Sequence, residues 1–157
     1  MKQLVASALL CLVFATVVSA QQDPQVGVRA TEATQVVVAT VVDVTARYGR
    51  NAYGDQLIYS DVVAEVSETL KGAPMNIVIV TVEGGDVGDV SLHVSDLPVM
   101  RKGERILYFL DRTANGQWVP HRRGLGIVKV GITERLDRVP MTLGEARAQI
   151  RNALAGR

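Results

Sequence analysis

The chain has 157 residues, of which 48% are hydrophobic and 21% are charged, a composition that suits one globular domain with its own core. Its 17 lysines and arginines nearly balance its 16 aspartates and glutamates, which argues against a nucleic-acid-binding surface and against electrostatic attachment to a membrane. The single cysteine is Cys11, so the chain beyond residue 20 has no means of forming a disulfide, a thiolate metal site or a cysteine nucleophile.

Residues 1–20 have the pattern of a secretory signal peptide. Lys2 gives a positive start, Leu4–Val18 is an uncharged apolar run, and Ser19 and Ala20 suit a signal peptidase site. The run is shorter than the roughly 20 residues that a membrane-spanning helix needs, and an uncleaved anchor is the alternative. We therefore expect a secreted or periplasmic protein with no transmembrane segment after signal cleavage.

Residues 21–34 lack a sustained apolar period, which predicts a flexible lead-in to a single domain at 35–157. The domain begins with Val36–Val44, whose β-branched residues favour a buried central strand. Leu57–Thr69 alternates with a period of two, which predicts the longest strand, with one face buried. The other predicted strands are Asn76–Val82, the short edge segment Val90–Val94, Arg105–Leu110 and Leu125–Ile132.

The C-terminal segment changes to a helical period. Thr142 and Glu145 have the spacing of a capping box, and Ala146 and Ile150 follow at helical intervals, which predicts an α-helix over 142–155. With about five principal strands, the chain is predicted to be mainly β: a small OB-like, partly open β-barrel with a C-terminal α-helix. A two-sheet sandwich is the alternative, because it buries alternating strands in the same way.

The stretch from VVVATVVDV through VVAEVSETLKG to NIVIVTV resembles the OB-like barrel of netrin-type modules, which include the tissue inhibitors of metalloproteases. Netrin-type modules carry disulfides, and this chain departs from them in having no cysteine after residue 20. The metalloprotease inhibitors reach the catalytic zinc with an N-terminal cysteine. Gln21 has no such group, so that inhibitory mechanism is not carried over.

The domain body, residues 36–132, more closely resembles a broad group of uncharacterised bacterial exported β-domains. The resemblance rests on Leu70-Lys71-Gly72 after the long strand, on Gly84-Gly85 after the next strand, and on Pro98 followed by Gly103-Glu104 and an apolar strand. The LHVSDL stretch before the proline departs from the more glycine-rich form of the group. The resemblance implies the fold and an exported bacterial location, and it brings no catalytic residue.

Two loops indicate a binding surface. Ligands of OB-like barrels often contact the loop between the first two strands and the loop between the fourth and fifth strands, which here are Thr45–Gln56 and Asp111–Gly124. These loops concentrate tyrosine, tryptophan and arginine, the residue types of interaction hot spots. In the alternative interpretation, these aromatic residues cover the loops and the end of the barrel. The predicted ligand-binding residues are Tyr48, Tyr53, Trp118, His121, Arg122 and Arg123.

The glycine-rich segment after the third strand offers the one acid–histidine cluster. Asp86, Asp89 and His93 are candidate ligands of a divalent cation, with a solvated loop as the alternative. No serine-hydrolase elbow, zinc-protease motif or phosphate loop is present. A small secreted hydrolase that activates Ser91 or Ser95 is a further alternative, because catalytic triads are recognised by geometry and not by sequence order.

Taken together, the sequence predicts an exported, non-enzymatic binding module. Its expected partner is a protein or a cell-envelope component, held by the two aromatic–basic loops, and no cofactor or nucleic acid is expected. The metal-binding β-domain and the small hydrolase are the two alternatives.

Overall fold

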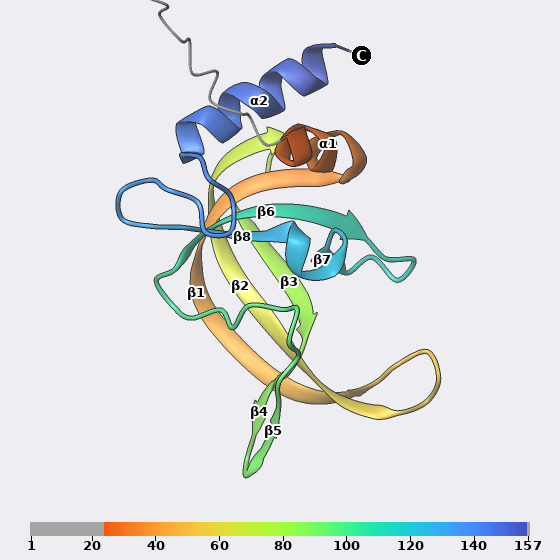
Figure 1. The fold of residues 1–157 in the computed structure, drawn as a ribbon. Helices are drawn as coiled ribbons and strands as arrows, with labels where there is room; N and C mark the ends of the chain where they lie inside the picture. Colours follow the sequence, from red (N-terminus) through yellow and green to blue (C-terminus); the bar gives the residue numbers. More distant parts are fainter. Residues whose placement is uncertain (1–23, 157) are drawn as a thin grey trace, which may run out of the picture.

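A computed structural model describes residues 24–156, and the predicted signal peptide at 1–20 and residues 21–23 lie outside this part. Figure 1 shows a curled sheet with two helices at one end and a narrow two-stranded projection at the other. In chain order the elements are α1 (Pro24–Glu32), β1 (Gln35–Arg50), β2 (Gln56–Lys71), β3 (Ile77–Glu83), β4 (Gly85–Val87), β5 (Val90–Leu92), β6 (Arg105–Arg112), β7 (Trp118–Pro120), the 3-10 turn η1 (Arg123–Gly126), β8 (Ile127–Val130) and α2 (Leu143–Ala155).

The main sheet has six strands in the order β1-β2-β3-β7-β6-β8, and β1 also pairs with β6. The strands β1, β2, β3, β7 and β6 therefore form a ring. The β3–β7 seam of this ring consists of one parallel pair, Val80 with Trp118, so closure is partial. The predicted fold class is confirmed: the protein is mainly β, with a partly closed sheet and a C-terminal helix.

Strands β1 and β6 carry apolar side chains on both faces because each face meets a different core. Alternation along the strands sends Val36 and Val38 to one side and Val37 and Val41 to the other. The helix-side core consists of Val26, Ala30, Ala33, Val36, Val38, Leu107, Phe109, Val128, Leu136, Val139, Met141, Leu143, Ala146 and Ile150. The interior core consists of Val37, Ala39, Val41, Val62, Ala64, Val78, Val80, Val82, Leu97, Met100, Ile106, Tyr108, Leu110 and Ile127.

Helix α1 corrects the prediction of a flexible lead-in, which is wrong for residues 24–34. Val26, Ala30 and Ala33 are fully buried in the helix-side core, at the i, i+4, i+7 spacing of one helix face. A Cβ atom at Gly27 would lie 3.2 Å from the Cβ of Ala153, so the two helices approach closely. Small residues form this face, and small residues give a weak apolar signal in a sequence.

Helix α2 confirms the predicted C-terminal helix. The Thr142 hydroxyl accepts a hydrogen bond from the backbone N–H of Glu145 at 3.3 Å, and the Glu145 carboxylate accepts one from the backbone N–H of Thr142 at 2.7 Å. This capping box satisfies donors that the first turn leaves unpaired. No helix within residues 24–156 is long and apolar enough to cross a membrane.

The hairpin of β1 and β2 is longer than the sequence predicted, so Thr45–Gln56 is not a long loop. Strand β1 runs to Arg50, and Tyr48 lies on the strand, opposite Ile58. Asn51 closes the short turn because its side-chain oxygen accepts the backbone N–H groups of Tyr53 and Asp55, each at 2.9 Å. Polar residues continue β1 because cross-strand partners on β2 are available to them.

The last predicted strand, Leu125–Ile132, is divided into the turn η1 and the shorter strand β8. Gly124 and Gly126 explain the division. A Cβ atom at Gly124 would lie 1.7 Å from the carbonyl oxygen of Asp96, and one at Gly126 would lie 2.6 Å from backbone atoms of His121. These glycines let a tight turn pack directly on neighbouring backbone, which a regular strand does not do.

Candidate functional site

A pocket of about 270 Å³ lies at one end of the interior core, beneath β4 and β5. We call these two strands and their turn, Gly85–Leu92, the arm; Figure 1 shows it projecting from the sheet. The apolar walls of the pocket include Val44, Ala46, Val62, Val82, Leu92, Val94, Leu97, Pro98, Val99 and Met100. Its polar side chains are Ser60, Glu83, Asp86, Ser91 and His93. Apolar walls with a few polar groups are typical of sites for small ligands.

The double glycine at the base of the arm holds it against β2. The backbone N–H of Gly84 donates to the carbonyl of Ile58 at 2.8 Å, and the Ser60 hydroxyl donates to the carbonyl of Gly84 at 2.7 Å. Both glycines have positive φ, 103° and 133°, and a Cβ at Gly85 would lie 2.4 Å from the Ser60 hydroxyl oxygen. The motif Gly84-Gly85 therefore positions one wall of the pocket.

The two carboxylates of the pocket have different partners. Glu83 pairs with Arg123 at 3.2 Å, and Arg123 also binds Asp96, with Nε 2.7 Å from a carboxylate oxygen. The hydrogen bond from Arg123 lowers the pKa of Asp96. Asp86 accepts a hydrogen bond from the neutral hydroxyl of Ser91, and the ion pairs within residues 24–156 do not include Asp86. Its negative charge therefore has no cationic partner in the described part of the chain.

The structure does not gather the aromatic residues that were predicted to bind a ligand. Tyr53 is 91% exposed in the β1–β2 turn, and Tyr48 lies on β1. Trp118 begins β7, packs against the interior core, and has the guanidinium of Arg112 at 5.1 Å from its ring centre. Figure 1 shows the β1–β2 turn well separated from β7. The β1–β2 turn and β7 therefore do not form one surface.

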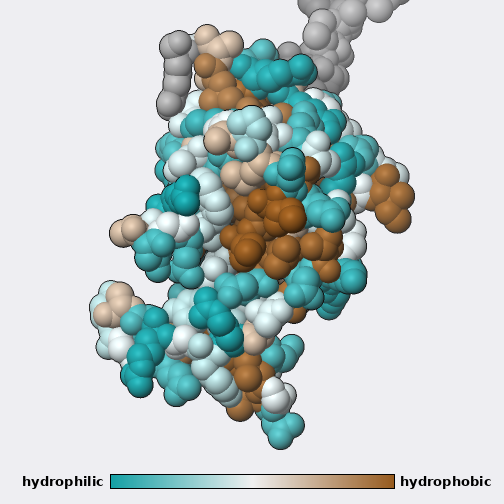
Figure 2. Space-filling view, turned by 180° about the vertical axis from the view of Figure 1, so that it is seen from behind, coloured by the Kyte–Doolittle hydropathy of each residue, from teal (hydrophilic) through white to brown (hydrophobic). Residues whose placement is uncertain are grey.

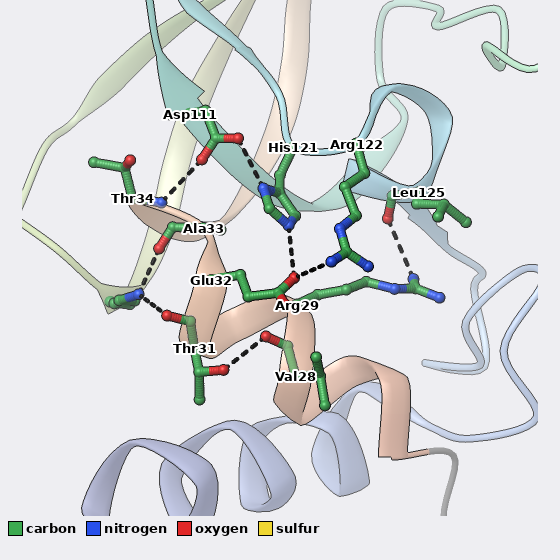
Figure 3. Close-up of polar contacts among 11 residues, drawn as sticks. Val28, Arg29, Thr31, Glu32, Ala33, Thr34, Asp111, His121, Arg122 and Leu125 are labelled. Atoms are coloured by element: carbon green, nitrogen blue, oxygen red, sulfur yellow. Dashed lines mark hydrogen bonds and ion pairs between the residues drawn. The ribbon is translucent and has the colours of Figure 1, made fainter. Parts of the chain in front are cut away.

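His121 is buried, with 8% of its surface exposed, between two carboxylates (Figure 3). Its Nδ1 lies 2.7 Å from Oδ2 of Asp111, and its Nε2 lies 3.3 Å from Oε2 of Glu32. Arg122 reaches the same Oε2 of Glu32 at 2.8 Å. Glu32 belongs to α1 and Asp111 to β6, so these residues fasten the helix to the sheet.

The predicted His-Arg-Arg group thus makes two separate sets of contacts: His121 and Arg122 bind Glu32, and Arg123 binds Glu83 and Asp96. Arg122 and Arg123 both have positive φ, 49° and 58°, and this unusual backbone sends Arg122 to Glu32 and Arg123 to Glu83 and Asp96. Glu32 was missed at the sequence level because it lay in the segment interpreted as flexible. The helical spacing of the small residues in α1 was the signal that could have found it.

The three predicted metal ligands do not form one cluster, whereas Ser91 of the hydrolase hypothesis lines the same pocket as Asp86 and His93. Within residues 24–156, no three histidine, cysteine, aspartate or glutamate side chains form a group that could hold a metal ion. Asp86 and His93 line the pocket, whereas Asp89 lies in the turn of the arm. The Ser91 hydroxyl donates to Asp86, and both ring nitrogens of His121 face carboxylates.

A separate apolar patch lies on the outer face of the sheet. Ile77 and Ile79 of β3 are 57% and 52% exposed, and Val63 of β2 pairs with Ile79. On the face seen in Figure 2, which is the back of the view in Figure 1, apolar side chains gather near the middle. Because neighbouring strand residues point to opposite faces, this patch lies on the other side of the sheet from Val62, which lines the pocket.

Comparison of the chain with models of known protein families gives no match, and no curated protein matches it. The fold and the site define the protein by class: a mainly β domain whose partly closed sheet carries a pocket beneath a two-stranded arm.

Proposed function

We propose that this protein is an exported binding module, and that the pocket beneath the arm holds a small amphipathic group. That group would be carried by a protein or by another component of the cell envelope. The observation that carries the proposal is the pocket itself, in which apolar side chains from three strands, the arm and the following loop surround about 270 Å³. Apolar surface buried there contributes roughly 25 cal/mol per Å².

The pocket is a better candidate surface than the two aromatic–basic loops. His121, Arg122 and Arg123 already form ion pairs or hydrogen bonds within the protein, and a ligand would have to compete with them. The pocket instead presents apolar walls in a concave site, where a ligand displaces water. The export of the protein rests on the pattern of residues 1–20.

The test uses a neutral amphipathic probe and one blocking substitution. Val44 lines the pocket and is 37% exposed, so Val44→Trp is expected to fill the mouth of the pocket without disturbing the core. Titration of the full chain with hexan-1-ol should shift the backbone NMR signals of the pocket residues, and Val44→Trp should weaken binding by about tenfold or more.

The matched control is Ile79→Trp, which adds the same side chain on the outer face of the sheet. This variant should bind hexan-1-ol as the native protein does, and signal dispersion will report whether each variant is folded. Shifts confined to the outer patch, or an equal loss of binding in both folded variants, would show that the pocket is not the binding site.

A further inference from the structure

The charged side chains that line the pocket are negative. Within the described part of the chain, its lining contains two carboxylates, Glu83 and Asp86, and no lysine or arginine. His93 is the one lining side chain that is able to gain a positive charge. We infer that the pocket selects a ligand with a positively charged head group, an ammonium or a guanidinium, on a short apolar body. This inference rests on the proposed function and names the ligand class of the same site.

Asp86 is the carboxylate that we assign to the head group. The charge of Glu83 is already offset by Arg123, which approaches it at 3.2 Å from outside the lining. Among residues 24–156, Asp86 has the Ser91 hydroxyl as its one hydrogen-bond donor, on Oδ1. A carboxylate has about four lone-pair sites, so Asp86 retains acceptor capacity for an incoming donor. Hydrogen bonds between ionised partners are about twice as strong as neutral ones.

The apolar body is assigned to the inner end of the pocket. Val82, Leu97 and Met100 line it there and belong to the interior core. The cavity volume of about 270 Å³ lies just below the range of roughly 300–1,000 Å³ that is usual for small-ligand pockets. This space suits a short alkyl chain or one long side chain of a partner.

The experiment compares three probes that share one chain and differ only in the head group: hexylammonium, hexan-1-ol and hexanoate. Each is titrated against the full chain at about pH 7.5, where an alkyl amine is protonated, and binding is followed by backbone NMR shifts. We expect hexylammonium to bind about fivefold tighter than hexan-1-ol, and hexanoate to bind most weakly.

Asp86→Asn should bring the affinities for hexylammonium and hexan-1-ol to within about twofold of each other. The control is Asp89→Asn, which removes the same charge in the turn of the same arm, outside the pocket lining. That variant should keep the preference for the ammonium probe. Both positions are exposed, so neither substitution is expected to disturb folding.

The outcomes separate this inference from the proposed function. If hexylammonium and hexan-1-ol bind the pocket equally, or hexanoate binds best, the charge preference is overturned and the pocket remains a binding site. If none of the three probes shifts the pocket signals, both proposals are overturned. An equal loss of preference in Asp86→Asn and Asp89→Asn would remove the assignment to Asp86.

Discussion

At the scale of single residues, a buried histidine connects the N-terminal helix to the sheet. A carboxylate only accepts hydrogen bonds, so each contact of His121 with Asp111 or Glu32 needs a proton on the facing ring nitrogen. In either neutral tautomer one of the two contacts is kept. Arg122 gives Glu32 a second partner, so Glu32 stays paired in both cases.

Replacing His121 with alanine should lower the free energy of unfolding by about 1–3 kcal/mol. Asp111 then loses its nearest hydrogen-bond donor, and Glu32 of α1 loses its contact with the imidazole ring. Urea denaturation measures this change. His93→Ala removes the other histidine, which is exposed, and should change stability by no more than about 0.5 kcal/mol. Equal stability of the two variants would show that the His121 contacts do not hold the helix.

At the scale of elements, the side chain of one aspartate links β1, β2 and β3, in addition to the backbone pairing of β2 with β3. Arg47 on β1 donates to Asp61 on β2 at 2.7 Å, and the hydroxyl of Thr81 on β3 donates to the same carboxylate at 2.7 Å. The hydrogen bond from Arg47 is the main reason that the pKa of Asp61 is lowered, with Thr81 acting in the same direction and burial opposing both.

This lowered pKa predicts how stability depends on pH. Asp61 stabilises the fold above the pKa that an aspartate has in the unfolded chain, about 3.9, and this contribution disappears as the pH falls through the lower folded pKa. The native protein should therefore be more stable than Asp61→Asn near neutral pH. The difference should shrink below about pH 4, measured by urea denaturation at several pH values.

The size of the effect should be at most about 1 kcal/mol, because the side chains of Arg47 and Asp61 are 44% and 28% exposed and water screens the pair. Asp43→Asn is the control, since Asp43 is exposed on β1 and accepts a hydrogen bond from the neutral hydroxyl of Thr45. A stability difference that stays constant down to about pH 2 would contradict the role of Asp61.

At the scale of the whole molecule, the two cores share strands β1 and β6. Val36 and Val38 belong to the helix-side core, and Val37 on the same strand belongs to the interior core. Loss of either core removes support from the strands that build the other. The single parallel pair at the β3–β7 seam is the thinnest connection of the ring, and Trp118, the sole tryptophan of the chain, lies there.

The shared strands predict that the molecule unfolds in one cooperative step. Trp118 fluorescence reports the seam and far-UV circular dichroism reports the helices and strands, so the two signals should change at the same urea concentration. A fluorescence change at distinctly lower urea would mean that the seam opens while the helix-side core is still folded.

Much of the fold was predictable because strands and helix caps depend on residues that are close in the sequence. The alternation in Leu57–Thr69 and the β-branched run at Val36–Val44 locate the two long strands, although β1 extends further than expected. Thr142 and Glu145 locate the last helix for the same reason. These features are local, and a single sequence contains them in full.

The site was decided by the tertiary structure, because its parts come from segments that only the curled sheet brings together. The pocket combines β1, β2, β3, the arm and the loop up to Met100, and no spacing in the sequence indicates that they meet. His121 meets Glu32 across 89 positions of the chain, while the β1–β2 turn and β7 lie apart. Local patterns determined which strands form, and the closing of the ring determined which side chains face one another.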